Sequence, residues 1–225
     1  MKITWLGQAG LLFETNGTKI MIDPYLSDSC GKVNPKLWRR FPVDESFLKI
    51  KPDVIILTHT HLDHTDPETL KHYLENDESV TVLASFNAWE KTRTTFKGNH
   101  NYVMFNAGTR FTVNGITFKA VYAEHSDFYA VGVIFEAEGK TYYVTGDTLY
   151  NEKVFKEVDE KIDAVFMPIN GVGNNMNACD AEDFAKRIDA KVAVPLHFSL
   201  FDELKPEEFE SVKTVIPKPF EEIKI

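Results

Sequence analysis

The sequence predicts a mixed α/β fold in which two β-sheets pack together and carry helices on their outer faces. Many short apolar runs typical of strands alternate with segments typical of helices along the 225 residues. A faint internal repeat supports this prediction, because residues 17–23 resemble residues 139–147 and each consists of a turn, an apolar strand and an aspartate. No low-complexity tract or linker divides the chain, so we expect residues 1–225 to form a single domain.

The first strands are defined by short apolar runs and one strong turn signal. Strand patterns cover residues 3–6, 11–15 and 19–23. Asn16-Gly17 between the last two is typical of a two-residue hairpin. The periodicity then fades over residues 24–51, where we expect a long loop. Residues 53–57 form a continuous apolar run, which predicts a buried strand.

Helices and further strands follow in alternation. A helix is expected directly after the buried strand, because Asp66 is a good N-cap and Pro67 suits the first helical position. Asp180 is the expected N-cap of a later helix. The other helices are predicted over residues 87–96, 150–158, 181–188 and 206–212. The remaining strands are predicted over residues 79–84, 102–105, 110–113, 116–123, 131–136, 141–145, 164–169 and 192–196.

The overall charge limits the kinds of partner that this protein can have. Its formal net charge is −9, whereas surfaces for nucleic acid or for anionic membranes usually carry a basic excess. A small anionic substrate is still allowed, because a metal ion or a few local cations can bind one. We therefore expect a small-molecule substrate and neither nucleic acid nor a membrane, while a homo-oligomer stays open.

The cysteines and the N-terminus indicate the cellular compartment. Cys30 and Cys179 form neither a CxxC pair nor a disulfide-rich pattern. The first residues read straight into a strand without the long apolar region of a signal peptide. No apolar run approaches the roughly 20 residues that span a bilayer. These observations predict a cytoplasmic protein.

The strongest chemical signal is the run HTHLDH, which directly follows the apolar residues 54–57. The run places four metal-binding side chains at the exit of a strand, namely His59, His61, Asp63 and His64. Imidazoles crowded beside a buried strand are costly when they are charged, and a metal ion resolves this cost by taking them as neutral ligands. The run therefore predicts a metal site; the alternative is an ordinary polar loop.

Three further residues stand at the ends of distant strands in the same way. His125, Asp147 and His197 each follow an apolar strand. Active sites in layered α/β folds commonly lie at strand ends. If these strands end at one rim of the sheets, all of these side chains converge there.

The complete pattern resembles the metallo-β-lactamase superfamily from the first strand to about His197. It consists of HxHxDH, a distant histidine, an aspartate in a Gly-Asp pair and a late histidine. This resemblance implies a four-layer αββα sandwich. Within the superfamily the chain looks most like the group around ascorbate-6-phosphate lactonase, which includes a phospholipase D. The narrower resemblance rests on WLGQAG at 5–10, IDPY at 22–25, PING at 168–171, GNNM at 173–176 and PLHF at 195–198.

The resemblance also implies a set of ligands for two divalent metal ions. It assigns His59, His61 and His125 to one ion, Asp63, His64 and His197 to the second, and Asp147 to both. A shared carboxylate agrees with the physics, because two cations about 3.5–4 Å apart need an anion between them. The lactonase resemblance favours Mn, and the wider superfamily favours Zn.

The implied function is that of a metal-dependent hydrolase. The metal ions lower the pKa of a bridging water, and the resulting hydroxide attacks a carbonyl or phosphoryl centre. Asp63 and Asp147 are the candidate catalytic residues, and Asp63 is hypothesised to accept a proton from the nucleophile. The expected substrate is a small polar or phosphorylated metabolite, as for a lactonase. The alternatives are a phosphodiesterase-type metallohydrolase and a metal-binding module without turnover.

Substrate recognition is less clearly marked in the sequence. Asn170, Asn174 and Asn175 lie in a loop whose amides could hold a polar group or a phosphate, although such a loop also suits a flexible turn. Arg39 and Arg40 could clamp a phosphate or a carboxylate, although such pairs are common in solvated loops. The chain is shorter than the characterised lactonase, and this leaves the substrate open.

Asp23 ends the third strand and has two interpretations. It could orient one of the metal ligands through a hydrogen bond. It could equally be a turn aspartate that terminates the strand before Pro24.

Overall fold

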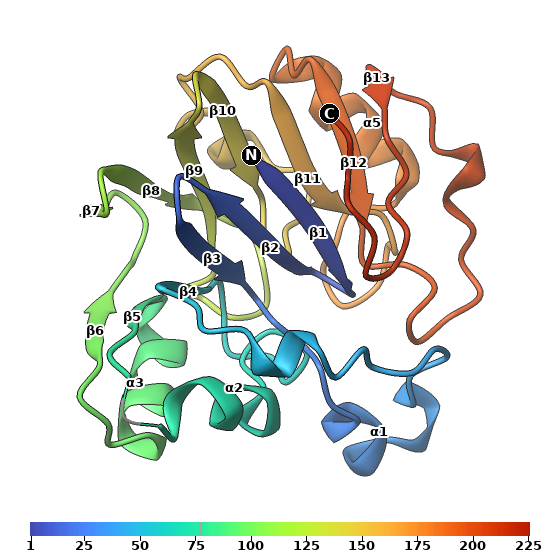
Figure 1. The fold of residues 1–225 in the computed structure, drawn as a ribbon. Helices are drawn as coiled ribbons and strands as arrows, with labels where there is room; N and C mark the ends of the chain where they lie inside the picture. Colours follow the sequence, from blue (N-terminus) through green and yellow to red (C-terminus); the bar gives the residue numbers. More distant parts are fainter. Residues whose placement is uncertain (77) are drawn as a thin grey trace.

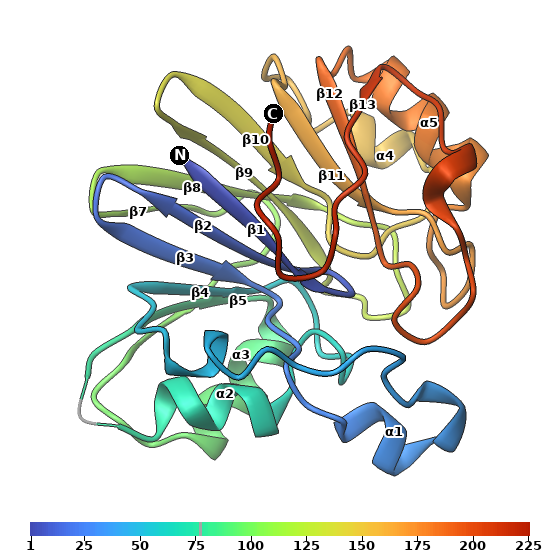
Figure 2. The same cartoon turned by 45° about the vertical axis from the view of Figure 1, so that its right-hand side comes forward.

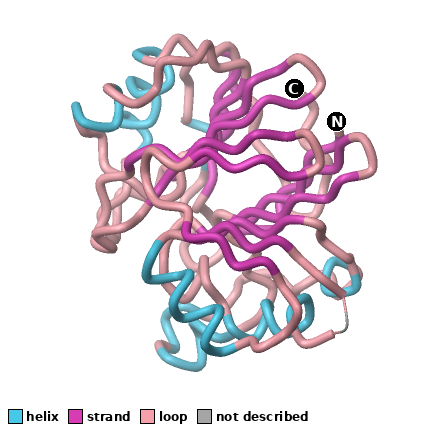
Figure 3. Tube along the Cα trace, turned by 90° about the vertical axis from the view of Figure 1, so that its left-hand side faces the viewer, coloured by secondary structure: helices cyan, strands magenta, loops and turns pink. Residues whose placement is uncertain are grey.

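The computed structural model describes residues 1–76 and 78–225, and its strands form two sheets that face each other (Figure 3). The first sheet has the order β1 (Lys2–Gly7), β2 (Gly10–Thr15), β3 (Thr18–Ile22), β4 (Val54–Leu57), β5 (Thr81–Ala84) and β6 (Asn101–Met104). The second sheet has the order β13 (Lys213–Thr214), β12 (Val192–Leu196), β11 (Ala164–Pro168), β10 (Lys140–Val144), β9 (Val131–Ala137), β8 (Ile116–Tyr122) and β7 (Arg110–Val113).

Helices cover the outer faces of both sheets, which confirms the expected four-layer αββα arrangement (Figures 2 and 3). The helices are α1 (Ser29–Val33), α2 (Pro67–Leu74), α3 (Phe86–Thr95), α4 (Glu152–Phe155) and α5 (Ala178–Arg187). Leu70 and Tyr73 of α2 pack with Met21 and Ile55 of the first sheet. Within the described residues, no helix has the length and apolar character needed to cross a membrane.

Aromatic side chains from both sheets fill the space between them. The ring of Phe13 in β2 meets the rings of Phe135 in β9 and Phe166 in β11 edge-on, at centroid distances of 5.1 and 5.6 Å. All three side chains are fully buried or nearly so. Edge-to-face contacts of this kind add to the burial of apolar surface and hold the sheets together.

The direction of the strands brings several strand ends to one rim. In the first sheet, β1 and β3 are both antiparallel to β2, and β4 is parallel to β3. In the second sheet, β10, β11 and β12 are parallel, and β8 runs in the same direction because β9 is antiparallel to both β8 and β10. Figure 1 shows β1, β11 and β12 running toward the same lower edge.

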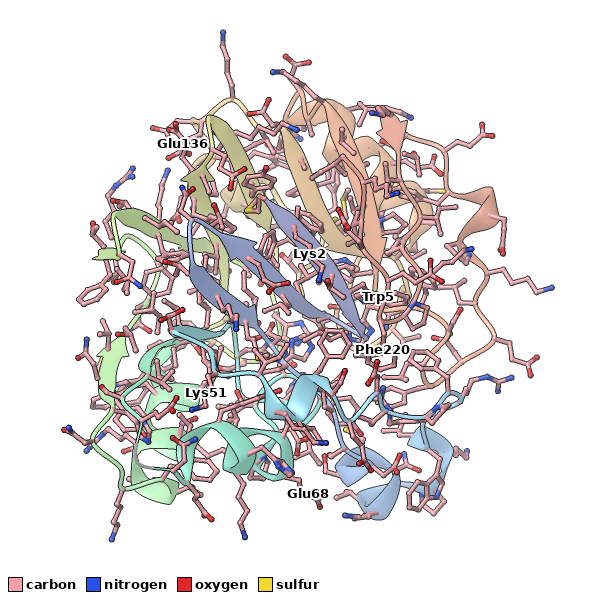
Figure 4. The ribbon with its side chains drawn as sticks, in the orientation of Figure 1. Lys2, Trp5, Lys51, Glu68, Glu136 and Phe220 are labelled. Carbon is pink, nitrogen blue, oxygen red and sulfur yellow. The ribbon has the colours of Figure 1, made fainter. Side chains whose placement is uncertain are left out.

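The C-terminal segment covers the free edge of β1. The amide of Phe220 donates to the carbonyl oxygen of Trp5 at 2.7 Å, and the amide of Ile223 donates to that of Ile3 at 2.8 Å. Figure 4 shows Trp5 and Phe220 next to each other at the end of β1. This pairing satisfies an edge strand that would otherwise expose its backbone groups.

The N-terminal hairpin is correctly predicted. Asn16 and Gly17 connect β2 to β3 with φ angles of 46° and 78°. Positive φ at both central residues is what a type I′ hairpin turn requires. The expected long loop at 24–51 is also mainly irregular, but it contains α1 and two 3₁₀ turns, Pro35–Leu37 and Phe47–Lys49.

The predicted helix at 206–212 is wrong. Only the 3₁₀ turn Pro206–Glu208 forms there. The amide of Glu210 donates to the side chain of Glu182 at 3.0 Å, and the Ser211 hydroxyl donates to the Glu182 carbonyl oxygen at 2.8 Å. Contacts with α5 therefore replace the hydrogen bonds that a helix would have made.

Two other helix predictions need correction. The N-cap of α5 is Asn177, whose side chain accepts from the amide of Asp180 at 2.9 Å, so Asp180 lies inside the first turn. Asn177 also forms a β-bridge with Asn170, and this contact sets where the helix begins. The helix predicted at 150–158 is shortened to α4, and beyond its end Lys119 donates to the carbonyl oxygen of Glu157 at 2.8 Å.

Candidate metal centre

The seven predicted metal ligands come together at the rim where the strands end. In a first group, His59, His61, His125 and Asp147 offer ligand atoms that lie within 4.8 Å of one another. In a second group, Asp63, His64 and His197 do the same. The ligands follow β4, β8, β10 and β12, which belong to both sheets. The expected convergence of these strand ends is therefore present.

Asp147 lies between the two groups. Its Oδ2 atom is 3.3 Å from Nε2 of His64 and 3.2 Å from Nε2 of His197, and its carboxylate also belongs to the first group. Within the first group, Nε2 of His125 lies 3.1 Å from Nδ1 of His61. This position suits a carboxylate shared by two cations.

Several polar atoms of the cluster are buried and have no hydrogen-bond partner within the described structure. They are Nε2 of His59, Nε2 of His64 and Oδ1 of Asp147. Buried polar atoms without a partner are rare because they lose their hydration and gain nothing in return. Neutral imidazole nitrogens and carboxylate oxygens are good ligands of Zn, Mn and Fe, so these residues fit a metal site.

Asp23 fixes the orientation of two histidines. Its carboxylate accepts from Nδ1 of His64 at 2.8 Å, from the Thr58 hydroxyl at 2.5 Å and from the Thr58 amide at 2.8 Å. Since the Thr58 hydroxyl donates to Asp23, it can accept from Nδ1 of His59, which lies 3.1 Å away. Both imidazoles thus keep Nε2 free for a ligand, and the orienting interpretation of Asp23 holds.

The sequence analysis missed Gln8. Its Nε2 donates to Oδ2 of Asp63 at 2.8 Å and lies 3.1 Å from the ring nitrogens of His197. The main-chain carbonyl oxygen of Gln8 accepts from the main-chain amide of His197 at 3.0 Å and from Nε1 of Trp5 at 2.9 Å. Gln8 therefore joins the end of β1 to the second group. Only its place in the WLGQAG segment marked it, since an amide by itself does not indicate metal chemistry.

The sequence analysis also missed Asp127, which is buried in the loop after β8. Its carboxylate accepts from the amide and hydroxyl of Thr60 at 3.0 and 2.7 Å, and from Nδ2 of Asn87 at 2.8 Å. These bonds tie the loop that carries His125 to the loop that carries His59. A polar residue two positions after a candidate ligand was the only signal in the sequence.

Electrostatics differ between the two groups. In the first group, burial and the neighbouring His64 hold the pKa of the His59 imidazole well below its usual value, and burial lowers the pKa of His125. In the second group, burial alone would lower the pKa of His197, but the carboxylates of Asp147 and Asp63 outweigh it and raise this pKa to about 9. His59 and His125 are therefore neutral near pH 7, as metal ligands must be.

The carboxylates respond to the same neighbours. Burial would raise the pKa of the Asp147 carboxyl, but the imidazoles of His197 and His64 hold it well below its usual range. The pKa of Asp63 is lowered in the same way, mainly by His64. The carboxyl groups of Asp147 and Asp63 are both anionic at neutral pH, so the cluster has negative charge to attract a cation.

There is a steric reason why a glycine precedes Asp147. Gly146 has a φ of 61°, and a Cβ atom there would lie 2.8 Å from the carbonyl oxygen of Val131 and 3.0 Å from Cβ of Thr58. A side chain would therefore push apart the strand ends on which Asp147 depends.

A cavity of about 270 Å³ adjoins the cluster, and two of the predicted substrate residues line it. They are Asn170 and Asn175. Nδ2 of Asn175 donates to Oδ2 of Asp147 at 2.9 Å. Asn174 contributes its carbonyl oxygen, which lies 3.1 Å from Nδ1 of His125. This loop thus supports ligands of both groups as well as facing the cavity.

The two predicted arginines lie elsewhere. The Arg39 guanidinium donates to the Tyr25 carbonyl oxygen at 2.9 Å and sits 5.4 Å from the ring centroids of Tyr25 and Phe41. Arg40 pairs with Glu203 at 2.9 Å. Neither arginine lines the cavity beside the histidines, so the geometry does not provide the predicted anion clamp there.

Comparison with known proteins agrees with this geometry. Residues 2–197 match the model of the family described as "Beta-lactamase superfamily domain". The chain is 32% identical to a UPF0173 metal-dependent hydrolase of Staphylococcus epidermidis, over 99% of both chains. It is 30% identical to a UPF0173 protein of Pyrococcus furiosus, over 93% of this chain and 89% of that one.

A solved structure shows the same fold. Igni18, a metallo hydrolase from the archaeon Ignicoccus hospitalis, superimposes with a TM-score of 0.78 at 21% identity, and the match covers 98% of this chain and 96% of that one. The narrower resemblance to the ascorbate-6-phosphate lactonase group is not confirmed by these comparisons. The chain belongs to the metallo-β-lactamase superfamily, and within it to the UPF0173 family, of which the Staphylococcus epidermidis relative is named a metal-dependent hydrolase.

Proposed function

We propose that this protein is a metal-dependent hydrolase with a dinuclear site, acting on a carbonyl centre of a small lactone- or ester-like substrate. The observation that carries the proposal is the set of buried, unpartnered ligand atoms on His59, His64 and Asp147. These atoms face a cluster of seven ligands beside a cavity of about 270 Å³. Two divalent ions held there would supply a hydroxide near neutral pH and polarise the oxygen under attack.

The chain's own residues divide the remaining work. Asp147 would be shared by both ions, because its carboxylate belongs to the first group and contacts two histidines of the second. Asp63 faces the cavity, and its Oδ2 is held by Gln8. Such a carboxylate can accept a proton from the nucleophile and pass it to the leaving group. Asn175 holds Asp147 at the cavity wall.

The cavity favours turnover over the alternative of a metal-binding module without activity. A structural metal site is closed by its protein ligands, whereas a catalytic site leaves positions for water and substrate. Asp63, His61 and His197 all line the cavity, so a small molecule can reach the cluster. We propose Zn or Mn as the metal, since the ligands are imidazoles and carboxylates without a thiolate.

The test is elemental analysis of protein purified without chelator, combined with a hydrolase screen of lactones, esters and phosphodiesters. We expect about two metal ions per chain, turnover of a carbonyl substrate, and loss of turnover on chelation. Turnover of phosphodiesters alone would favour a phosphodiesterase instead. A folded protein that binds no metal and stays inactive after metal is added would overturn the proposal.

A further inference from the structure

The cavity beside the metal ligands has two chemically different parts. One part of its lining is polar and includes His61, Asp63, Asp147, His197, Asn170 and Asn175. The other part is apolar and is formed by Cys30, Leu37, Val172 and Phe201. A substrate whose scissile group reaches the metal ligands must therefore place another part of itself against apolar side chains.

Three of the apolar lining residues belong to a small apolar cluster. Tyr25 and Cys30 are buried in it, and Leu37 and Phe201 pack against them. The rings of Tyr25 and Phe201 meet edge-on at a centroid distance of 5.7 Å. This wall is therefore packed in place, as a preorganised binding surface requires.

A second apolar contribution comes from Val172 in the loop after β11. Its side chain is 63% exposed although it lines the cavity. It stands between Gly171 and Gly173, whose φ angles of 65° and 68° shape the loop tip. An exposed aliphatic side chain at the mouth of a cavity gains by being covered, and a bound apolar group would cover it.

Away from the metal ligands, the described lining of this cavity offers no lysine or arginine. The acidic Asp202 is among the lining residues. Arg39 donates one bond to the Tyr25 carbonyl oxygen, Arg40 pairs with Glu203, and neither arginine lines the cavity. A phosphate or carboxylate placed away from the metal ligands would lose hydration without finding a cation.

From these observations we infer that the site selects uncharged substrates that carry an apolar substituent, and that it disfavours phosphorylated or carboxylated ones. The inference rests on the proposed function for the position of the scissile group. It replaces the phosphorylated metabolite that the sequence allowed. The volume of about 270 Å³ lies just below the ~300–1,000 Å³ range of ligand cavities, so the substituent is short.

Binding and hydrolysis are measured separately to test this inference. Binding uses straight-chain hydroxamic acids of increasing length, together with one that ends in a carboxylate, titrated calorimetrically into the metal-loaded protein. Hydrolysis uses p-nitrophenyl esters of the same chain lengths and the matching carboxylate-ended ester. We expect each added methylene to improve binding and kcat/KM by up to about fourfold until the cavity is full. The carboxylate-ended members should fall below their uncharged counterparts.

Three variants sharpen the result. Val172→Ser should reduce the gain from chain length while leaving the shortest ligand unchanged. Val172→Lys should improve binding of the carboxylate-ended ligand, by about two- to fivefold. Val33→Ser is the matched control, because Val33 is 78% exposed in α1 and does not line the cavity. It should leave the whole series unchanged.

The outcomes separate the inference from the proposed function. Chain-length-dependent binding without hydrolysis of any ester would refute the proposed function and support the inference. Hydrolysis that is indifferent to chain length, or that prefers the anionic member, would overturn the inference and support the proposed function. Equal effects of Val172→Ser and Val33→Ser would also overturn it, because the gain would then not arise in this cavity.

Discussion

The two groups of metal ligands are supported by different neighbours and therefore differ in their charge. The first group is partly exposed at His61 and His125 and is supported by loop contacts from Asp127 and the Asn174 carbonyl oxygen. The second group is more buried, and its histidine His64 is surrounded by the carboxylates of Asp23, Asp63 and Asp147. His64 and His197 are consequently held in the charged form, whereas His59 and His125 of the first group are held neutral.

Because of this difference in charge, one cluster can bind two ions unequally. An ion that enters the first group finds neutral imidazoles and needs to displace no proton from His59 or His125. An ion that enters the second group must displace protons from His64 and His197, whose pKa values are raised by nearby carboxylates. Metal loading of the second group should therefore depend more strongly on pH.

Removing the shared ligand should have the largest effect, because it acts on both groups. We expect Asp147→Ala to lower kcat/KM by at least about a thousandfold and to reduce the metal content. Asp183→Ala is the control, since this side chain is 71% exposed on α5. Activity of Asp147→Ala close to that of the unchanged protein, with full metal content, would contradict the placement of Asp147 between the two groups.

Residues that support the two groups separately should have smaller and distinguishable effects. Asp127→Ala releases the loop of His125, and Gln8→Ala releases Asp63 and His197. We expect each to lower metal affinity or activity by about 10–100-fold, with the loss confined to one ion in each variant. Two-step metal titrations check this. If both variants weakened the same binding step, the two groups would not be supported independently.

The stability of the chelated protein should change with pH because of the second group. The pKa of His197 is raised to about 9 in the fold from an ordinary value near 6.5. The stabilisation by its charged form is therefore complete below about pH 6.5 and is lost as the pH rises to about 9. We expect the Tm of the chelated protein to fall across this window.

His59 does not oppose this trend, because its lowered pKa acts only below about pH 6.5. Thermal denaturation of the chelated protein, with His197→Asn as the comparison, measures the effect. The Tm of the His197→Asn variant should fall less over this pH range than that of the unchanged protein. A decline of equal size in both proteins would assign it to other groups.

Removing the hydrogen bond from Trp5 to Gln8, which supports the cluster, should have the smallest effect. Trp5→Phe removes the bond from Nε1 to the Gln8 carbonyl oxygen, which still accepts from the His197 amide. We expect a loss of about 1–2 kcal/mol in the free energy of unfolding with little change in kcat/KM. Urea denaturation measures it, and Trp38→Phe at an exposed position is the control. A large loss of activity with unchanged stability would mean that Trp5 acts on the site rather than on the fold.

Local patterns predicted most of the fold because they describe properties of short segments. The Asn16-Gly17 hairpin depends on two residues that accept positive φ, and the buried strand before His59 depends on one apolar run. The helix at 206–212 failed for the opposite reason, since the Glu210 amide and the Ser211 hydroxyl bond to Glu182, which is distant in the sequence. Asn177 likewise displaced Asp180 as a cap because of its bridge to Asn170.

The chemistry of the centre could be read from the order of its residues alone. The sequence supplied imidazoles and carboxylates directly after apolar strands, and parallel strands that end at one rim must bring such residues together. Only the tertiary structure decided which groups support them and what surrounds the substrate. Gln8 and Asp127 act through contacts made across 55 or more residues, and Arg39 turned toward Tyr25 rather than toward the cavity. The direction in which a long polar side chain points is set by the partners that the fold places near it, and a one-dimensional pattern does not contain them.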